Sequence, residues 1–304
     1  MTQLWHDIFY TSRDGLRLYA RHYPSIAPHR RPALCLAGLT RNCRDFHDLA
    51  VFLADPANPQ TRDVYAVDYR GRGRSQSDPD WRNYSLQVEL LDVLDFMTIR
   101  GLHDTAIIGT SRGGLIALIM ASQRPGSIGA VVLNDIGPVI DREGLLRIVA
   151  YVGRVPLPAS WAEATQLAAS LNERQFPAIP SHHWEEIARQ WFNDGHGRPL
   201  HGYDQDLARA ISIDAGELPV LWPQFEALSS RPAMVIRGEL SDILSNKTVQ
   251  EMRLRHPNLE TLTVPGEGHA PLLRDRPTQI AIAEFLAKAD VKSSGATVRT
   301  LAQA

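Results

Sequence analysis

The segment Thr105-Ala106-Ile107-Ile108-Gly109-Thr110-Ser111-Arg112-Gly113-Gly114 decides the fold, because it joins an apolar strand to a helix through a glycine-rich turn. Residues Gly109 to Gly113 form a G-x-S-x-G motif, and the helical run Leu115 to Gln123 follows at once. In this context the serine lies on a strained turn with its hydroxyl above the sheet edge, and the two glycines avoid clashes with the neighbouring strand and helix. An incidental serine in a glycine-rich turn is the alternative. The motif favours Ser111 as a catalytic nucleophile.

Apolar segments of strand length alternate with helical segments on both sides of this motif. Continuous apolar strands suit a parallel sheet that is covered by helices on both faces. Near the start, Asp14-Gly15 is a turn signal between two short strand patterns, so these strands are expected to form an antiparallel hairpin. We therefore predict an α/β fold with a mostly parallel, eight-stranded sheet. The expected parallel strands are Ala33 to Ala37, Val64 to Val67, Thr105 to Ile108, Ala130 to Leu133, Met234 to Arg237 and Thr261 to Val264.

The strand pattern disappears between residues 137 and 222, where prolines recur and four of the six tryptophans gather. No strand is expected there, and the segment is predicted to be a helical lid inserted into the core. Residues 1–136 and 223–290 are then the two parts of the core, and residues 291–304 are expected to be a flexible tail.

A serine hydroxyl needs a base to remove its proton and an acid to orient that base. His269 follows the strand Thr261 to Val264, and Asp242 follows the strand Met234 to Arg237, so both are expected at the same sheet edge as Ser111. Their order along the chain is nucleophile, acid, base. Glu239 and Asp135 stay open as rivals for the acid. Asp242 is preferred because Asp135 stands where the chain leaves the sheet for the insertion, a position that suits a cap or an anchor.

Acyl transfer also needs hydrogen-bond donors aimed at the oxygen that becomes negative. The backbone N–H of Arg112, directly after the serine, is one candidate. The backbone N–H of Leu39, in the loop after the strand Ala33 to Ala37, is the other. The side chain of Arg112 is expected to form a structural ion pair.

With these residues in place, the chain resembles a lidded α/β-hydrolase over nearly its whole length. The segment Asp68-Tyr69-Arg70-Gly71-Arg72-Gly73-Arg74-Ser75 is similar to the D-x-R-G-x-G-x-S loop that members carry after the second parallel strand. The resemblance implies an architectural role for this loop. Ala37-Gly38 stands where members often have His-Gly, so any contribution of that histidine is missing.

Relatives that open epoxides or remove halides have an aspartate at the nucleophile position, and Ser111 argues against both reactions. We therefore expect a serine carboxylic ester hydrolase for small to medium acyl groups, acting on a small-molecule ester without a metal or organic cofactor. An enol-lactonase or a carbon–carbon bond hydrolase would use the same triad, and a receptor-like ligand binder is a further alternative. In the lid, Trp161, Trp184 and Trp191 are expected to bind substrate.

The composition limits the classes of partner. Acidic residues number 34 and basic residues 32, so no basic excess is available for nucleic acid. No apolar run reaches the length of a membrane span, and the first residues lack the pattern of a secretory signal, so a cytoplasmic location is expected. Two cysteines cannot form a disulfide framework. The oligomeric state stays open.

Overall fold

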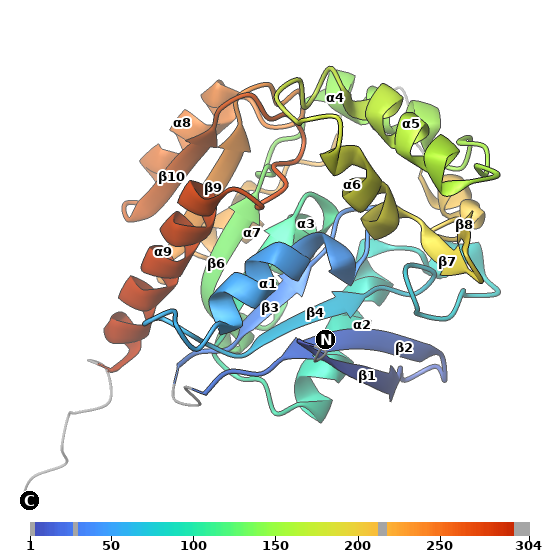
Figure 1. Ribbon diagram of the computed structural model, residues 1–304. Coiled ribbons are helices and arrows are strands. Elements are labelled where there is room, and N and C mark those ends of the chain that lie inside the picture. The colour runs from blue at the N-terminus through green and yellow to red at the C-terminus, as the bar shows by residue number, and fades with distance from the viewer. Residues whose placement is uncertain (1–3, 27–29, 212–217, 295–304) are drawn as a thin grey trace, which may run out of the picture.

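An eight-stranded sheet organises the computed structural model, which describes residues 4–26, 30–211 and 218–294 (Figure 1). The strand order is β1-β2-β4-β3-β5-β6-β9-β10. Strands from β4 to β10 pair in parallel, whereas β1 pairs with β2, and β2 with β4, in antiparallel fashion. The predicted fold class and N-terminal hairpin are confirmed. The strands are β1 (His6–Thr11), β2 (Arg17–Tyr23), β3 (Ala33–Leu36), β4 (Val64–Asp68), β5 (Thr105–Thr110), β6 (Ile128–Asn134), β9 (Ala233–Gly238) and β10 (Leu259–Val264).

Helices cover both faces of this sheet (Figure 1). Two helices that contact each other, α1 (His47–Ala54) and α9 (Arg276–Ser294), lie on one face. The other face carries α2 (Leu86–Ile99), α3 (Arg112–Gln123) and α7 (Trp222–Glu226), and α8 (Asn246–Arg255) connects β9 to β10. Short 3₁₀ turns are η1 (Cys43–Phe46), η2 (Trp81–Asn83), η3 (Pro125–Ser127) and η4 (Gln205–Ala210).

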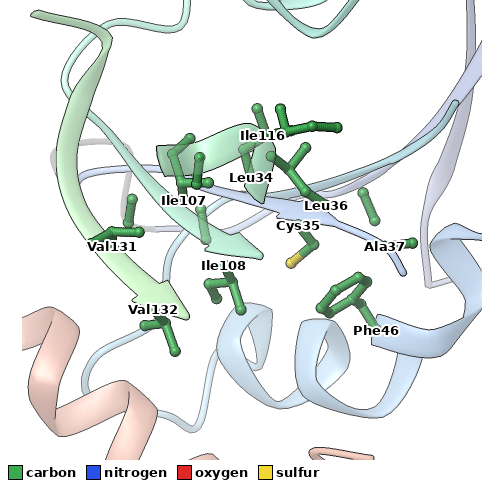
Figure 2. Packing of buried hydrophobic residues seen from close by; sticks show 14 of the residues in the cluster. Leu34, Cys35, Leu36, Ala37, Phe46, Ile107, Ile108, Ile116, Val131 and Val132 are labelled. Carbon is green, nitrogen blue, oxygen red and sulfur yellow. The ribbon is translucent and has the colours of Figure 1, made fainter. Parts of the chain in front are cut away.

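The central strands are buried on both sides, which explains their unbroken apolar sequence. Side chains of β3 alternate between the two faces (Figure 2). Leu34 and Leu36 point toward Ile116 of α3, and Cys35 points toward Phe46 on the opposite side. All five of these side chains are buried. Successive side chains of β3 point to opposite faces of the sheet and all are apolar. The strand therefore packs against the layers on both faces.

The residues of the expected lid form α4 (Arg142–Tyr151), α5 (Trp161–Asn172) and α6 (His183–Trp191). The expectation that this segment has no strands is wrong, because β7 (Asn193–Gly195) and β8 (Arg198–Leu200) form a small antiparallel hairpin. Its turn, His196-Gly197, has both residues at positive φ, so the chain reverses over two residues. We call residues 137–222 the lid segment; its residues 212–217 lie outside the described residues.

Two predictions near chain boundaries can be placed on these elements. Residue 222, the expected end of the lid segment, is the first residue of α7, which packs against α3. Residues 291–294 of the expected tail continue α9, and residues 295–304 lie outside the described residues.

No helix among the described residues combines the length and apolar character that crossing a bilayer requires. Cys35 and Cys43 are buried free thiols.

Candidate active site

Ser111 lies on the turn between β5 and α3 with φ 51° and ψ −113°. This left-handed conformation is costly for a residue with a side chain and is typical of functional sites. A Cβ atom added at Gly113 would lie 2.1 Å from the Leu36 carbonyl oxygen, and one at Gly109 would lie 2.6 Å from the backbone of Gly113. Only glycine fits at either position. The tight crossing of β3, β5 and α3 therefore holds the serine at the N-terminus of α3.

The loop after β10 brings His269 to this serine. Its Nε2 atom lies 2.8 Å from Ser111 Oγ, and its Nδ1 atom lies 2.8 Å from Asp135 Oδ2. The histidine side chain is 6% exposed and the aspartate side chain is fully buried. The structure thus brings together a hydroxyl, an imidazole and a carboxylate in an unbroken line. Such a line can pass a proton from the hydroxyl to the imidazole while the carboxylate fixes the ring.

The prediction that Asp242 orients the histidine is wrong. Asp135, directly after β6 and itself at φ 55°, occupies that place. Its carboxylate also accepts hydrogen bonds from the Gly238 N–H at 2.8 Å and from Ser241 Oγ at 2.5 Å, so β9 and its loop hold it in position. A buried carboxylate needs such donors to remain charged. Asp135 is one of the two rivals for the acid that the sequence left open. It follows the apolar strand Ala130 to Leu133, just as Ser111 follows the apolar strand Thr105 to Ile108.

Asp242 faces the lid segment instead. Its carboxylate forms a two-bond ion pair with Arg147 of α4, at 2.6 and 2.8 Å. Burial alone would raise the pKa of this carboxyl. The hydrogen bonds and the charge of Arg147 lower the pKa by more than burial raises it, so the pKa lies below its usual value. Asp242 therefore joins the lid segment to the β9 loop, and the carboxylate that is hydrogen-bonded to the imidazole is that of Asp135.

Gln175, between α5 and α6, is a residue that the sequence did not indicate. Its Oε1 accepts a hydrogen bond from the backbone N–H of His269 at 2.9 Å, and its Nε2 donates to Asp242 at 3.4 Å. A lone glutamine in a lid carries no sequence signal. Through it the lid segment holds the histidine loop directly.

A second contact joins the lid segment to the chain after β3. Asn42 Nδ2 and Arg44 Nε each donate to the backbone carbonyl of Gln190, at 3.0 Å. Arg44 Nη2 also donates to the Phe192 carbonyl at 3.1 Å. The C-terminal end of α6 is thereby fastened beside the loop that carries Leu39.

Of the two expected oxyanion donors, Arg112 follows the serine as the first residue of α3, and Leu39 lines the same cavity as the serine. Within the described part of the chain, no hydrogen bond engages the backbone N–H of Leu39 or of Arg112. An N–H at the first residue of a helix has no partner inside the helix, which leaves the Arg112 donor for a ligand. Both groups therefore have the free hydrogen-bonding capacity that an oxyanion site requires.

A buried charge cluster holds both donor residues. Glu89 of α2 accepts a hydrogen bond from Arg112 Nε at 2.5 Å, and its other oxygen lies 2.8 Å from Arg72 Nη2, a close ion contact that is not aligned as a hydrogen bond. Arg72 Nε in turn donates to the Leu39 carbonyl at 3.0 Å. The Arg112 side chain thus forms the ion pair expected for it. One carboxylate indirectly fixes the backbone on both sides of the site.

A cavity of about 160 Å³ opens beside Ser111 and His269. Apolar side chains from the core and the lid segment line most of it, among them Phe46, Ile148 and Phe176. Apolar walls with a few polar groups are typical of small-molecule sites. The cavity can therefore receive a small apolar or mixed group next to the serine.

Of the three lid tryptophans expected to bind substrate, only Trp191 lines this cavity. Trp184 is buried in a separate cluster with residues of α5 and α6, and Trp161 packs against that cluster. The expectation for Trp161 and Trp184 is corrected for a physical reason. Helices of an inserted segment must bury apolar area among themselves, and large aromatic side chains do this well.

Among residues 4–26, 30–211 and 218–294, no group of three or more His, Cys, Asp and Glu side chains is arranged to hold a metal ion.

Comparison with known proteins places this site in a family. The family model described as "Alpha/beta hydrolase family" matches residues 33–283. The chain is 33% identical over 285 residues to the 3-hydroxybutyrate-oligomer hydrolase of Cupriavidus necator, a match that covers 90% of this chain and 93% of that protein. It is 25% identical over 234 residues to the 2-(acetamidomethylene)succinate hydrolase of Mesorhizobium japonicum, covering 76% and 79% of the two chains.

A solved structure agrees with these matches. The crystal structure of an alpha/beta hydrolase from Novosphingobium aromaticivorans superposes with a TM-score of 0.87 at 37% identity, covering 95% of this chain and 100% of that chain. The resemblance inferred from the sequence motifs is confirmed, and these curated relatives are hydrolases. The chain belongs to the alpha/beta hydrolase family.

Proposed function

We propose that this protein is a serine hydrolase that cleaves carboxylic esters through an acyl-enzyme. The observation that carries the proposal is the line from Ser111 Oγ through His269 to Asp135, with 2.8 Å at each step. These distances are within the range needed for direct proton transfer. One relative is named 3-hydroxybutyrate-oligomer hydrolase. Short esters of hydroxy acids are therefore the first substrates to test.

In the first half of the reaction, His269 Nε2 takes the Ser111 proton as Oγ bonds to the ester carbonyl carbon. The carbonyl oxygen becomes negative and accepts hydrogen bonds from the N–H groups of Leu39 and Arg112. Asp135 holds the Nδ1–H tautomer and stabilises the imidazolium. The carbon–oxygen ester bond then breaks, and the imidazolium gives its proton to the departing alcohol.

The second half repeats these steps with water. His269 takes a proton from water as the hydroxide adds to the acyl carbon, and Ser111 leaves with the proton returned by the imidazolium. The acid product dissociates as a carboxylate. The imidazole must be unprotonated to act as the base in both halves of the reaction.

The test is hydrolysis of 4-nitrophenyl butyrate by the wild type and by Ser111→Ala. The variant should lose at least about 10³-fold in kcat, because the nucleophile is gone. A fluorophosphonate probe should label the wild type at Ser111 and leave the variant unlabelled, while circular dichroism shows both folded. Equal ester turnover by a folded Ser111→Ala protein would refute the proposal.

A further inference from the structure

Arg41 lies in the chain after β3, two residues beyond Leu39, and lines the same cavity as Ser111. A methyl group added at Gly38 would lie 3.3 Å from Arg41 Cγ and 3.8 Å from Ser111 Cβ, so the two residues flank Gly38. The Arg41 side chain is only 18% exposed. A cationic side chain therefore lines the same mostly apolar cavity as the serine.

The guanidinium is fixed on one edge and one face. Its Nε and Nη2 atoms donate to the two Asp45 oxygens at 2.6 and 2.7 Å. Its carbon lies 3.9 Å from the ring centroid of Trp191 in α6. A guanidinium has five N–H donors, and this pairing uses two of them. Within the described part of the chain, Nη1 donates no hydrogen bond. The N–H donors on the Nη1/Nη2 edge are therefore available to another acceptor.

The other polar groups that line the cavity do not offer a second cationic side chain beside the Nη1/Nη2 edge of Arg41. Arg41 and Asp45 balance each other's charge, but the pair leaves N–H groups of Arg41 unused, whereas the Asp45 carboxylate can only accept. Burial lowers the pKa of His201, which also lines the cavity, so its ring is uncharged near neutral pH. Trp191 lines the cavity too, and its buried Nε1–H has no acceptor among the residues that the structure describes. Among the described residues, Arg41 is the one arginine or lysine that lines the cavity.

We propose that Arg41 binds a carboxylate of the substrate, so that the enzyme prefers esters of hydroxy acids whose carboxyl group is free. This inference rests on the proposed ester hydrolysis and names its substrate class. A planar guanidinium fork matches a carboxylate with two parallel hydrogen bonds, and low surrounding polarity strengthens them. An anion without a cationic partner would be excluded from the same apolar cavity. The free end of the Arg41 side chain selects the substrate, and Ser111 cleaves it.

The test compares the 3-hydroxybutyrate dimer acid with its methyl ester, two substrates that differ only in the charge at one end. The wild type should have the higher kcat/KM on the acid. Arg41→Met should lower the acid-to-ester ratio of kcat/KM by about 10-fold or more, the usual effect of losing a charge-assisted hydrogen bond. Free 3-hydroxybutyrate should inhibit the wild type competitively, with a Ki at least several-fold higher for the variant.

Two matched variants separate recognition from structure. Arg44→Met removes a neighbouring arginine that contacts the lid backbone and does not line the cavity, and it should keep the ratio. Asp45→Asn removes the competing carboxylate while keeping the Arg41 cation, and it should keep or raise the ratio. A purely structural role for the Arg41–Asp45 pair would instead make both Arg41→Met and Asp45→Asn lower activity on the acid and the methyl ester alike.

The two proposals fail differently. Absence of Ser111-dependent hydrolysis of 4-nitrophenyl butyrate overturns the proposed function. If that ester is hydrolysed but the dimer acid is not preferred over its methyl ester, or if the preference survives Arg41→Met, the carboxylate subsite alone is overturned.

Discussion

Asp135 and Asp242 provide the sharpest test at the scale of single residues, because they are isosteric carboxylates on neighbouring loops. Asp135→Asn should lower kcat by roughly 10³–10⁴-fold, since an amide no longer holds the Nδ1–H tautomer or stabilises the imidazolium. Asp242→Asn breaks the ion pair with Arg147 and leaves the bond between Asp135 and His269 intact. Its loss of kcat should be at least 100-fold smaller. Steady-state kinetics with 4-nitrophenyl butyrate measures both.

If Asp242→Asn lost more kcat than Asp135→Asn, Asp242 would be the acid that orients His269. Such a result would mean that the carboxylates exchange places when substrate binds, and a crystal structure of each variant with a bound phosphonate would detect the exchange. Thermal unfolding of both variants checks that neither loss comes from unfolding.

The sequence identified Ser111 and His269 but not the partner of the histidine, and the reason is geometric. Strands β6 and β9 are neighbours in the sheet, so the loops that carry Asp135 and Asp242 reach the same edge. Strand periodicity cannot tell which carboxylate turns inward. In the structure Ser241 donates to Asp135, and Arg147 of the lid segment donates to Asp242; both contacts join residues far apart in the sequence.

At the scale of elements, the loop after β3 depends on the loop after β4. Arg72 donates from the second loop to the Leu39 carbonyl and touches Glu89 on α2. Arg72→Met should lower kcat about 10-fold with little change in KM, because a displaced Leu39 N–H weakens transition-state binding more than substrate binding. Glu89 keeps its bond to Arg112 in this variant, so the buried carboxylate still has one cationic partner.

Arg74→Met is the control for this effect. Arg74 lies on the same loop, but its side chain pairs with Asp7, away from the oxyanion donors. It should reduce kcat much less than Arg72→Met, and Arg72→Lys should recover part of the lost rate by restoring a donor. Equal kcat values for the wild type and Arg72→Met would show that Leu39 needs no such support.

The elements themselves were largely predictable. Apolar runs such as Ala33 to Leu36 became β3 because every position is buried, and Ser85 caps α2 by accepting from the Val88 N–H. The β7–β8 hairpin was missed because three-residue strands contain no period to detect. The packing of Trp184 inside the lid segment was also beyond reach, since helical spacing fixes a face but does not identify what covers it.

At the scale of the whole molecule, the pair Asp242–Arg147 ties the lid segment to the core and makes that tie sensitive to pH. The pKa of Asp242 lies below its usual 3.8, so the folded protein holds this carboxyl charged more strongly than the unfolded chain does. Its stabilising contribution is present above about pH 4 and is lost as pH falls through the lowered pKa. Asp242→Asn should therefore destabilise the protein at pH 7 and less so near pH 3.

Urea unfolding at the two pH values measures this difference. The free-energy gap between the wild type and Asp242→Asn should narrow on acidification. A gap that stays constant would mean that Arg147 stabilises the charged and the neutral carboxyl equally.

Two of the contacts that fasten the lid segment lie beside the site: Gln175 accepts from the backbone of His269, and the Gln190 carbonyl accepts from Asn42 and Arg44. A displacement of this segment that broke both contacts would therefore loosen the backbone of His269 and the chain next to Leu39 in the same movement.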